Sequence, residues 1–328
     1  MKTELRGILS AILTPFNTSD GQLDEGAYKA LVRSQVAAGI HGIVASGSTG
    51  EHPALSVAER QRVFALATEA AAGDCDVIAH VGSNNVRDAL ELTRAAKDQG
   101  VDQMLVVTPY FDRLKFHEVQ RFLEKVVAIA GGPIIYYDTP GITGLDISEE
   151  QMVTLRQDGL VSHIKDSPAS FTRTMRMLSN PDAPTVLAGS DPALLAVLAH
   201  GAPGSIIGAS TFVPELCVAL YDAATARDLP RALQIWDRLW PILNFMLLNG
   251  YVALAKAGSA IRGLPLGEPR GRLADEGLTW RMAQSARARQ LADHPSLADL
   301  SDLGEDSDAY RAILDAALKN EIWRKPRR

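Results

Sequence analysis

Residues 76–107, DVIAHVGSNNVRDALELTRAAKDQGVDQMLVV, contain the unit on which the predicted fold rests. The stretch begins with a short apolar run, Asp76–Val81, that is typical of a buried strand. A helical pattern follows and ends at Gly100, because glycine suits the left-handed conformation that closes a helix. A second apolar run, Gln103–Val107, starts almost at once. The stretch therefore predicts a strand, a helix and a second strand parallel to the first.

The same alternation continues from the start of the chain to about residue 225. Short apolar runs alternate with longer amphipathic ones, and two more helical patterns end in glycine, at Gly39 and Gly201. A serine followed three residues later by Glu or Gln has capping-box spacing at two helix starts, Ser56 and Ser148. The predicted strands are Gly7–Leu13, Gly42–Ala45, Asp76–Val81, Gln103–Val107, Pro133–Tyr137, Val161–Lys165, Thr185–Ala188 and Ser205–Gly208.

Eight strands separated by helices predict an α/β protein with a parallel sheet, which could be closed or doubly wound. We favour closure because the count is eight and no G-x-G-x-x-G fingerprint follows the first strand. The prediction is a (β/α)8 TIM barrel over residues 1–225, with a C-terminal helical region over residues 226–328 packed on the barrel. The helices expected in that region are Pro230–Leu248, Gly250–Arg262, Leu278–Leu291 and Asp306–Lys319.

Composition excludes several classes of protein. The chain has 328 residues and a formal net charge of −6, and basic residues concentrate only at 324–328, which argues against a nucleic-acid partner. No apolar run reaches the roughly 20 residues that span a bilayer, and the start lacks a signal-peptide pattern, so we expect a cytoplasmic protein with no membrane partner. Cys75 and Cys217 are too few for a disulfide framework, and no metal-ligand spacing occurs, so we expect no metal.

Barrel enzymes carry their reacting groups at the carboxyl ends of the strands, and Lys165 is the unusual residue there. A lysine that ends a buried strand must be paired, extended to the surface or functional. Pairing with Asp166 or a surface carboxylate is the structural alternative. The functional alternative is a nucleophile, because removal of an amine from water favours its neutral form, which can attack a carbonyl.

Two further strand ends carry candidate groups. Tyr137 ends the strand before that of Lys165, and its phenol could shuttle protons, although a tyrosine there is also common in packing. The stretch Gly47-Ser48-Thr49-Gly50 offers hydroxyls and backbone N–H groups that could cradle a carboxylate, and a plain turn is its structural alternative. It is not a phosphate-binding P-loop, because the lysine and the spacing of that motif are absent.

These residues are similar to motifs of the dihydrodipicolinate synthase / N-acetylneuraminate lyase family, over roughly residues 5 to 290. The motifs occur in order at predicted strand ends: Thr14-Pro15-Phe16, Gly47-Ser48-Thr49-Gly50-Glu51, Thr108-Pro109-Tyr110, Tyr137-Asp138-Thr139-Pro140 with Thr143-Gly144, and Ile164-Lys165-Asp166-Ser167. The resemblance implies a pyruvate-type class I aldolase or dehydratase without metal or organic cofactor. It also implies a homo-oligomer, either a tetramer built from two dimers or a dimer.

The resemblance assigns a role to each matching position. Lys165 would form an imine with a 2-oxo acid, and Tyr137 would be the general acid and base. Ser48 would relay protons and, with Thr49 and Gly47, hold the substrate carboxylate. The remaining expected substrate-binding residues are Gly189 and Ile207 at the pyruvate end, with Ser167, Ser190 and Asp191 toward the substrate hydroxyls.

Two positions depart from the dihydrodipicolinate synthases within this family. Those synthases usually carry an arginine where this chain has Ile142, and a relay tyrosine where it has Phe111. Ser48 and the Lys165-Asp166-Ser167 stretch look more like sugar-acid aldolases. The leading hypothesis is therefore a lyase, aldolase or dehydratase, acting on a 2-keto-3-deoxy sugar acid. The alternatives are a 4-hydroxy-tetrahydrodipicolinate synthase condensing pyruvate with aspartate semialdehyde, and a non-catalytic barrel that binds small acids.

Overall fold

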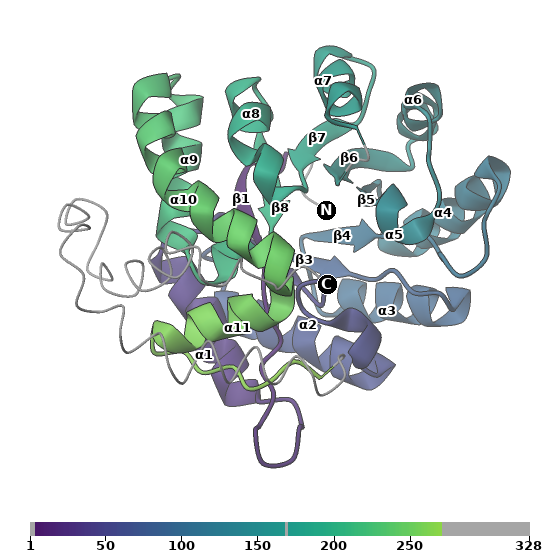
Figure 1. Ribbon diagram of the computed structural model, residues 1–328. Helices are drawn as coiled ribbons and strands as arrows, with labels where there is room; N and C mark the ends of the chain where they lie inside the picture. Colours follow the sequence, from purple (N-terminus) through teal and green to yellow (C-terminus); the bar gives the residue numbers. More distant parts are fainter. Residues whose placement is uncertain (1–3, 168–169, 271–328) are drawn as a thin grey trace, which may run out of the picture.

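A computed structural model describes residues 4–167 and 170–270 as a closed barrel of parallel strands surrounded by helices (Figure 1). Each strand pairs with the next along the chain, and β8 pairs with β1 to close the barrel. The predicted fold is therefore confirmed, with strand ends shifted by at most two residues. The strands are β1 Gly7–Ala11, β2 Gly42–Ala45, β3 Asp76–His80, β4 Gln103–Val106, β5 Ile134–Asp138, β6 Val161–Asp166, β7 Thr185–Ala188 and β8 Gly204–Ile207.

Helices connect the strands and form the outer layer (Figure 1). The expected capping boxes are present at Ser56 and Ser148, and Gly39, Gly100 and Gly201 have the positive φ that closes a helix. The helices are α1 Glu25–Ala37, α2 Val57–Ala71, α3 Val86–Asp98, α4 Phe116–Ala130, α5 Pro140–Thr143, α6 Glu149–Gln157, α7 Phe171–Ser179, α8 Leu194–Ala199, α9 Pro214–Thr225, α10 Leu229–Asn249 and α11 Tyr251–Ile261, with short 3-10 turns η1 His52–Ala54, η2 Asp191–Ala193 and η3 Ala209–Thr211.

Apolar side chains form two clusters, one between strands and helices and one inside the barrel. The inner cluster includes Ile78 of β3, Leu105 of β4, Ile135 and Tyr137 of β5, and Ile206 of β8. Residues alternate along a strand, so every second residue of each strand faces the barrel interior. Lys165 stands two positions after His163 on the same face of β6, and its backbone pairs with Tyr137 of β5.

Helices α10 and α11 belong to the same body as the barrel helices. Ile235, Leu239, Ile242 and Leu243 of α10 are buried in the outer cluster, as expected for a region packed on the barrel. The proposed boundary near residue 225 stays a prediction. The helices expected over 278–291 and 306–319, and the extension that includes residue 323, lie outside the described residues.

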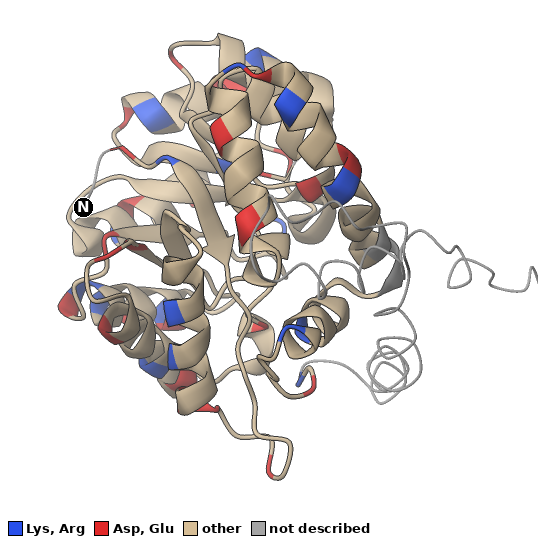
Figure 2. Cartoon of the chain, turned by 90° about the vertical axis from the view of Figure 1, so that its left-hand side faces the viewer, with Lys and Arg blue, Asp and Glu red and all other residues tan. Residues whose placement is uncertain are grey.

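Charged residues of both signs are mixed over the outer helices on the side drawn in Figure 2. The two cysteines, Cys75 and Cys217, are buried and form no disulfide. Within residues 4–167 and 170–270, no helix is both long and apolar enough to cross a membrane.

Closure of the barrel depends on a close approach of two backbones, where Gly204 of β8 lies opposite Gly7 of β1. A methyl group on Gly204 would overlap the backbone oxygen and nitrogen of Gly7. We expect Gly204→Ala to lower the free energy of unfolding by about 2 kcal/mol or more, because neither backbone can move without breaking the strand pairing. The matched control is Gly141→Ala, where the added methyl group meets nothing within 4 Å. Equal urea midpoints for the two variants would contradict this account of closure.

Candidate active site

Lys165 and Tyr137 lie side by side inside the barrel at the carboxyl ends of β6 and β5. The strand register pairs them directly, and the Lys165 Nζ atom lies 4.0 Å from the centroid of the Tyr137 ring. Only 4% of Lys165 and 7% of Tyr137 are exposed. The structure thus places an amine against a phenol in a space largely closed to bulk solvent.

The environment of Tyr137 favours loss of its proton. Burial raises the pKa of the phenol, but the positive charge of Lys165 and hydrogen bonds with Ser48, Lys165 and Ser167 outweigh burial, so that the pKa of Tyr137 is lowered. Opposite charge and hydrogen bonds stabilise the phenolate. Tyr137 is therefore suited to give and take protons beside the amine.

A buried ion-pair network holds the ends of β5 and β6 from the outside of the barrel. Arg173 of α7 lies 2.5 Å from an oxygen of Asp138 and 3.4 Å from an oxygen of Asp166. Thr174 donates a hydrogen bond of 2.5 Å to Asp166. Because Asp138 follows Tyr137 and Asp166 follows Lys165, this network fixes the two reactive residues relative to each other.

Asp138 is the least stably ionised member of this network. Burial raises its pKa to about 6, and the charge of Arg173 opposes that rise without cancelling it. The pKa of Asp166 is also raised by burial, against its hydrogen bond with Thr174. The ion-pair network therefore contains a carboxyl group, that of Asp138, with a pKa of about 6.

The loop after β2 carries Ser48 and Thr49 and is tied down on two sides. The Thr14 hydroxyl of the β1 end donates a hydrogen bond of 2.7 Å to the Gly50 carbonyl. Glu51, in the left-handed region with a φ of +57°, lies 2.9 Å from the ammonium group of Lys256 on α11. Burial lowers the pKa of Lys256 to about 8, although Glu51 opposes the shift. A helix of the C-terminal region thus holds the loop that carries Ser48.

Asp191, expected to bind substrate hydroxyls, is engaged by α11. Its two carboxylate oxygens each lie 2.9 Å from the Tyr251 hydroxyl, and Ala209 N–H donates to it over 3.3 Å. Burial raises the pKa of Asp191, while Tyr251 and Ala209 oppose the shift. Tyr251 also accepts a 3.1 Å hydrogen bond from Gly208 N–H. Tyr251 and Ala209 thus already contact the Asp191 carboxylate. A role for Asp191 in binding substrate hydroxyls stays a prediction.

Gly189, Ser167 and Thr49 lie around the same barrel end. The Ser167 hydroxyl donates a 2.8 Å hydrogen bond to the Gly189 carbonyl, and a methyl group on Gly189 would overlap that hydroxyl oxygen. The Thr49 hydroxyl lies where a side chain on Gly208 would be. The small residues after β7 and β8 therefore leave the room that these hydroxyls use. Gly47 accepts the His52 backbone N–H and closes the loop.

Two expected substrate-binding residues are placed differently. Ile207 packs in the outer cluster between strands and helices, whereas its neighbour Ile206 faces the barrel interior in the cluster that includes Tyr137. Adjacent residues of a strand face opposite sides, and a role for Ile207 at the pyruvate end stays a prediction. Ser190 caps the turn η2, and its carbonyl accepts the Ala193 N–H. Its role toward substrate hydroxyls stays a prediction.

Three residues of the site, two of them buried, were not expected from the sequence. His80, at the carboxyl end of β3, has its ring 6.4 Å from that of Tyr137, and the His52 ring lies 4.6 Å from that of His80. Arg60 of α2 contacts His80 from the other side. The sequence offered one indication of this group, which is that His80 stands at the end of a predicted strand. Within the described ranges no group of three His, Cys, Asp or Glu residues is arranged to hold a metal ion.

The two departures from the synthase motifs lie at the protein surface. Phe111 is 86% exposed, and Ile142, which belongs to the short helix α5 after β5, is 59% exposed. The N–H groups of Tyr110 and Phe111 both donate to the Asn84 side chain, which fixes the loop after β4. An exposed phenylalanine on a fixed loop is suited to contact with another subunit. The homo-oligomer expected from the sequence stays a prediction.

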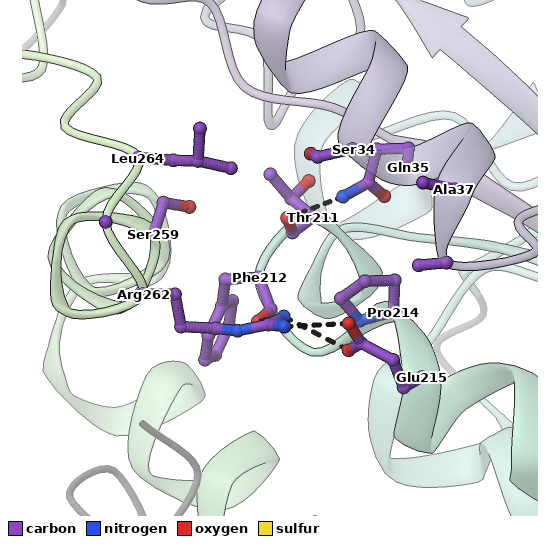
Figure 3. A pocket seen from close by; sticks show the side chains of 12 residues that line it. Ser34, Gln35, Ala37, Thr211, Phe212, Pro214, Glu215, Ser259, Arg262 and Leu264 are labelled. Atoms are coloured by element: carbon purple, nitrogen blue, oxygen red, sulfur yellow. Dashed lines mark hydrogen bonds and ion pairs between the residues drawn. The ribbon is translucent and has the colours of Figure 1, made fainter. Parts of the chain in front are cut away.

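A cavity of about 460 Å³ lies outside the barrel, between α1, the start of α9 and the end of α11 (Figure 3). Its charged residues neutralise each other, because Arg262 and Glu215 form an ion pair of 2.7 Å. Its serine hydroxyls, on Ser34 and Ser259, donate to carbonyl groups of their own helices. The cavity shares no residue with the group around Lys165, and it presents no nucleophile.

Comparisons with known proteins agree with the motifs. The model of the dihydrodipicolinate synthetase family matches residues 4–279. A 4-hydroxy-tetrahydrodipicolinate synthase of Phenylobacterium zucineum is 38% identical over 71% of this chain and 79% of that protein. The synthase structure of Methylacidiphilum fumariolicum has a TM-score of 0.80 at 28% identity and covers 92% of this chain and all of that one. A dihydrodipicolinate synthase of Acinetobacter baumannii complexed with pyruvate has a TM-score of 0.78 at 27% identity, covering 85% of this chain and 98% of that one.

The titration of Asp138 predicts a pH dependence of stability. Its pKa of about 6 in the folded chain exceeds the ordinary 3.8, so its favourable contribution is fully present below about pH 3.8 and is lost as the pH rises through 6. Relative to Asp138→Asn, the wild-type free energy of unfolding should fall by roughly 2 kcal/mol from pH 4 to pH 7. Urea unfolding of both proteins across this range measures the difference. A difference that is independent of pH would show that Asp138 does not titrate there.

Proposed function

Because the chain belongs to the dihydrodipicolinate synthetase family, we propose that it is a lyase that binds pyruvate as an imine on Lys165 and joins it to an aldehyde, or reverses that reaction. The observation that carries the proposal is the contact between the buried Lys165 amine and the Tyr137 ring, with Ser48 hydrogen-bonded to the phenol. Because this family consists of enzymes, membership of it also argues against a non-catalytic barrel that binds small acids. The cytoplasmic location stays a prediction.

The proposed chemistry begins when the Lys165 amine attacks the C2 carbonyl of pyruvate. The carbinolamine that forms must lose water to become an imine, and this loss requires a proton on the departing oxygen. Removal of a C3 proton then moves an electron pair into the imine and gives an enamine. The enamine carbon forms a bond to the aldehyde carbon, and hydrolysis frees the product from Lys165.

Tyr137 is placed to carry each of these protons. It touches Lys165, and its hydrogen bonds with Ser48 and Ser167 provide routes for protons away from the amine. Because the pKa of the phenol is lowered, a larger fraction of Tyr137 is deprotonated at a given pH than of a water-exposed tyrosine, so more of it is available to accept a proton. The loop Gly47–Gly50 would hold the carboxylate of pyruvate, so that C2 faces the amine.

The second substrate is proposed first as aspartate semialdehyde. The relatives at 33–38% identity are named 4-hydroxy-tetrahydrodipicolinate synthase, and none of these supports the expected closeness to sugar-acid aldolases. In this proposal the aldehyde condenses with the pyruvate enamine at Lys165. The names of these relatives favour the synthase over the sugar-acid lyase that the motifs alone suggested.

A 2-keto-3-deoxy acid remains the second candidate because of Ile142. The turn Pro140–Thr143 that follows β5 carries no cation, and Ile142 is exposed at its tip. Aspartate semialdehyde brings a carboxylate, which an apolar side chain cannot pair with, whereas a sugar acid brings hydroxyls at that end. This residue therefore favours a substrate whose far end is uncharged.

Proton exchange into pyruvate tests the proposal without the second substrate. Enamine formation replaces the methyl protons of pyruvate with deuterium from D2O, which proton NMR follows directly. We expect exchange to require Lys165. In Tyr137→Phe the exchange rate should fall by a factor of about 10² to 10⁴, because the phenol carries the proton. Lys125→Met, at an exposed lysine of the outer helix α4, is the control for loss of a lysine outside the site. Exchange that persists in Lys165→Ala would contradict the assignment.

The second substrate is tested by turnover and by Ile142→Arg. If aspartate semialdehyde is the substrate, the added guanidinium should lower its KM by roughly tenfold, because a charge-assisted contact is gained. Turnover of 2-keto-3-deoxy sugar acids with no measurable reaction of aspartate semialdehyde in either protein would reject the synthase. The opposite pattern would reject the sugar-acid candidate.

A further inference from the structure

Arg60 is a buried cation whose acceptors are all neutral. It extends from α2 and is 4% exposed, and its guanidinium donates to the Ser46 hydroxyl over 3.0 Å, to the Gly82 carbonyl over 3.0 Å and to the His80 carbonyl over 2.5 Å. No carboxylate among residues 4–167 and 170–270 forms an ion pair with it. Buried arginines are normally paired with an anion, because an isolated buried charge is costly.

The hydrogen bonds of Arg60 hold a strained part of the loop after β2. Ser46 has a φ of +57°, which a serine rarely adopts, and it lies two residues before Ser48. Its hydroxyl accepts from Arg60, and its carbonyl lies 3.0 Å from the His80 Nδ1 atom. The same Nδ1 atom lies 3.3 Å from the Arg60 guanidinium, so His80 links Arg60 to the Ser46 carbonyl. Arg60 and His80 together set the direction in which the loop carries Ser48 toward Tyr137.

The histidines beside Arg60 do not neutralise its charge. Burial lowers the pKa of Arg60 to about 10, and attraction to Tyr110 and Asp88 opposes that shift without reversing it. Burial lowers the pKa of His80 well below its ordinary value, with His52, Arg60 and Lys165 adding to the shift. Burial likewise lowers the pKa of His52 to about 3, with Arg60 and Lys165 adding and a hydrogen bond with Gly47 opposing. Both imidazoles are therefore neutral at pH 7, and the His80 Nε2 atom has no hydrogen-bond partner in the described part of the chain. They lie within the electrostatic reach of both Arg60 and Lys165.

We propose that Arg60 is the positioning and specificity residue for the carboxylate of the 2-oxo acid: it holds the Ser46–Ser48 turn and supplies, from behind that turn, the positive charge that selects an anion. This inference rests on the proposed function, since the anion is the carboxylate of the acid bound at Lys165. Substrate binding then provides the anion that the buried guanidinium lacks in the free protein. Arg60 acts through the loop and through space, without touching the reacting atoms.

A purely structural Arg60 would make a different prediction. Loss of the hydrogen bonds that link the ends of β2 and β3 would slow the reaction of charged and neutral substrates alike. Loss of a charge that selects an anion would impair only the charged one. The comparison of pyruvate with pyruvamide, its neutral amide with the same ketone, therefore separates the two roles.

The experiment measures methyl-proton exchange of pyruvate and of pyruvamide by NMR, for wild type, Arg60→Gln and Arg60→Lys. We expect wild type to prefer pyruvate. Arg60→Gln loses the hydrogen bonds, so its kcat should fall for both compounds, and it also loses the charge, so its KM should rise for pyruvate alone and the preference should fall on the order of tenfold. Arg60→Lys keeps the charge but not the three-way hydrogen bonding. It should retain the preference while its kcat falls for both compounds. Circular dichroism and thermal unfolding establish that each variant is folded.

Two outcomes would overturn the inference, and they differ from failure of the proposed function. An unchanged preference for pyruvate in folded Arg60→Gln would show that the charge does not select the anion. Loss of the preference in folded Arg60→Lys would show the same, and this variant decides the question if Arg60→Gln does not fold. If wild type exchanges neither compound, the proposed function fails and the inference falls with it.

Discussion

The hydrogen-bonded register between β5 and β6 is the constraint on which the site depends. It pairs Tyr137 with Lys165, so that an amine and a phenol project side by side into the barrel, 4.0 Å apart as measured from Nζ to the ring centroid. A shift of one residue on either strand would turn one of the two side chains toward the helices. Because the barrel is closed, β5 and β6 are each hydrogen-bonded to a strand on both sides, so neither strand can shift alone without breaking its other pairing.

Two sets of contacts support this pair from opposite sides. On the outside of β5 and β6, Arg173 joins Asp138 and Asp166, each of which follows a reactive residue. On the far side of the barrel end, α11 supplies Lys256 to Glu51 and Tyr251 to Asp191. The helices after the barrel therefore act in the site by holding its loops, and a barrel cut at residue 225 would lack these supports.

The fold was predictable from the sequence because its signals are local. Short apolar runs, glycines at helix ends and the capping boxes at Ser56 and Ser148 each need only a few neighbouring residues. Lys165, Tyr137 and Ser48 were also accessible, because a parallel barrel gathers its strand ends at one face. Tyr251 and Lys256 were not, since the docking of α11 depends on contacts with residues far away in the chain. The side of β8 on which each side chain lies was less accessible, because Ile207 packs toward the helices and its neighbour Ile206 toward the barrel interior. The burial of Arg60 was inaccessible because its partners are backbone carbonyls and a hydroxyl.

The most direct measurement of the central claim is reduction of the protein with borohydride in the presence of pyruvate, followed by intact mass and peptide mapping. The account predicts one added pyruvate-derived group per chain, on the peptide that contains Lys165, and none on the peptide that contains the buried Lys256. Lys165→Ala should gain no such group while remaining folded. A folded wild-type protein that gains no adduct, or gains it on another lysine, would contradict the account.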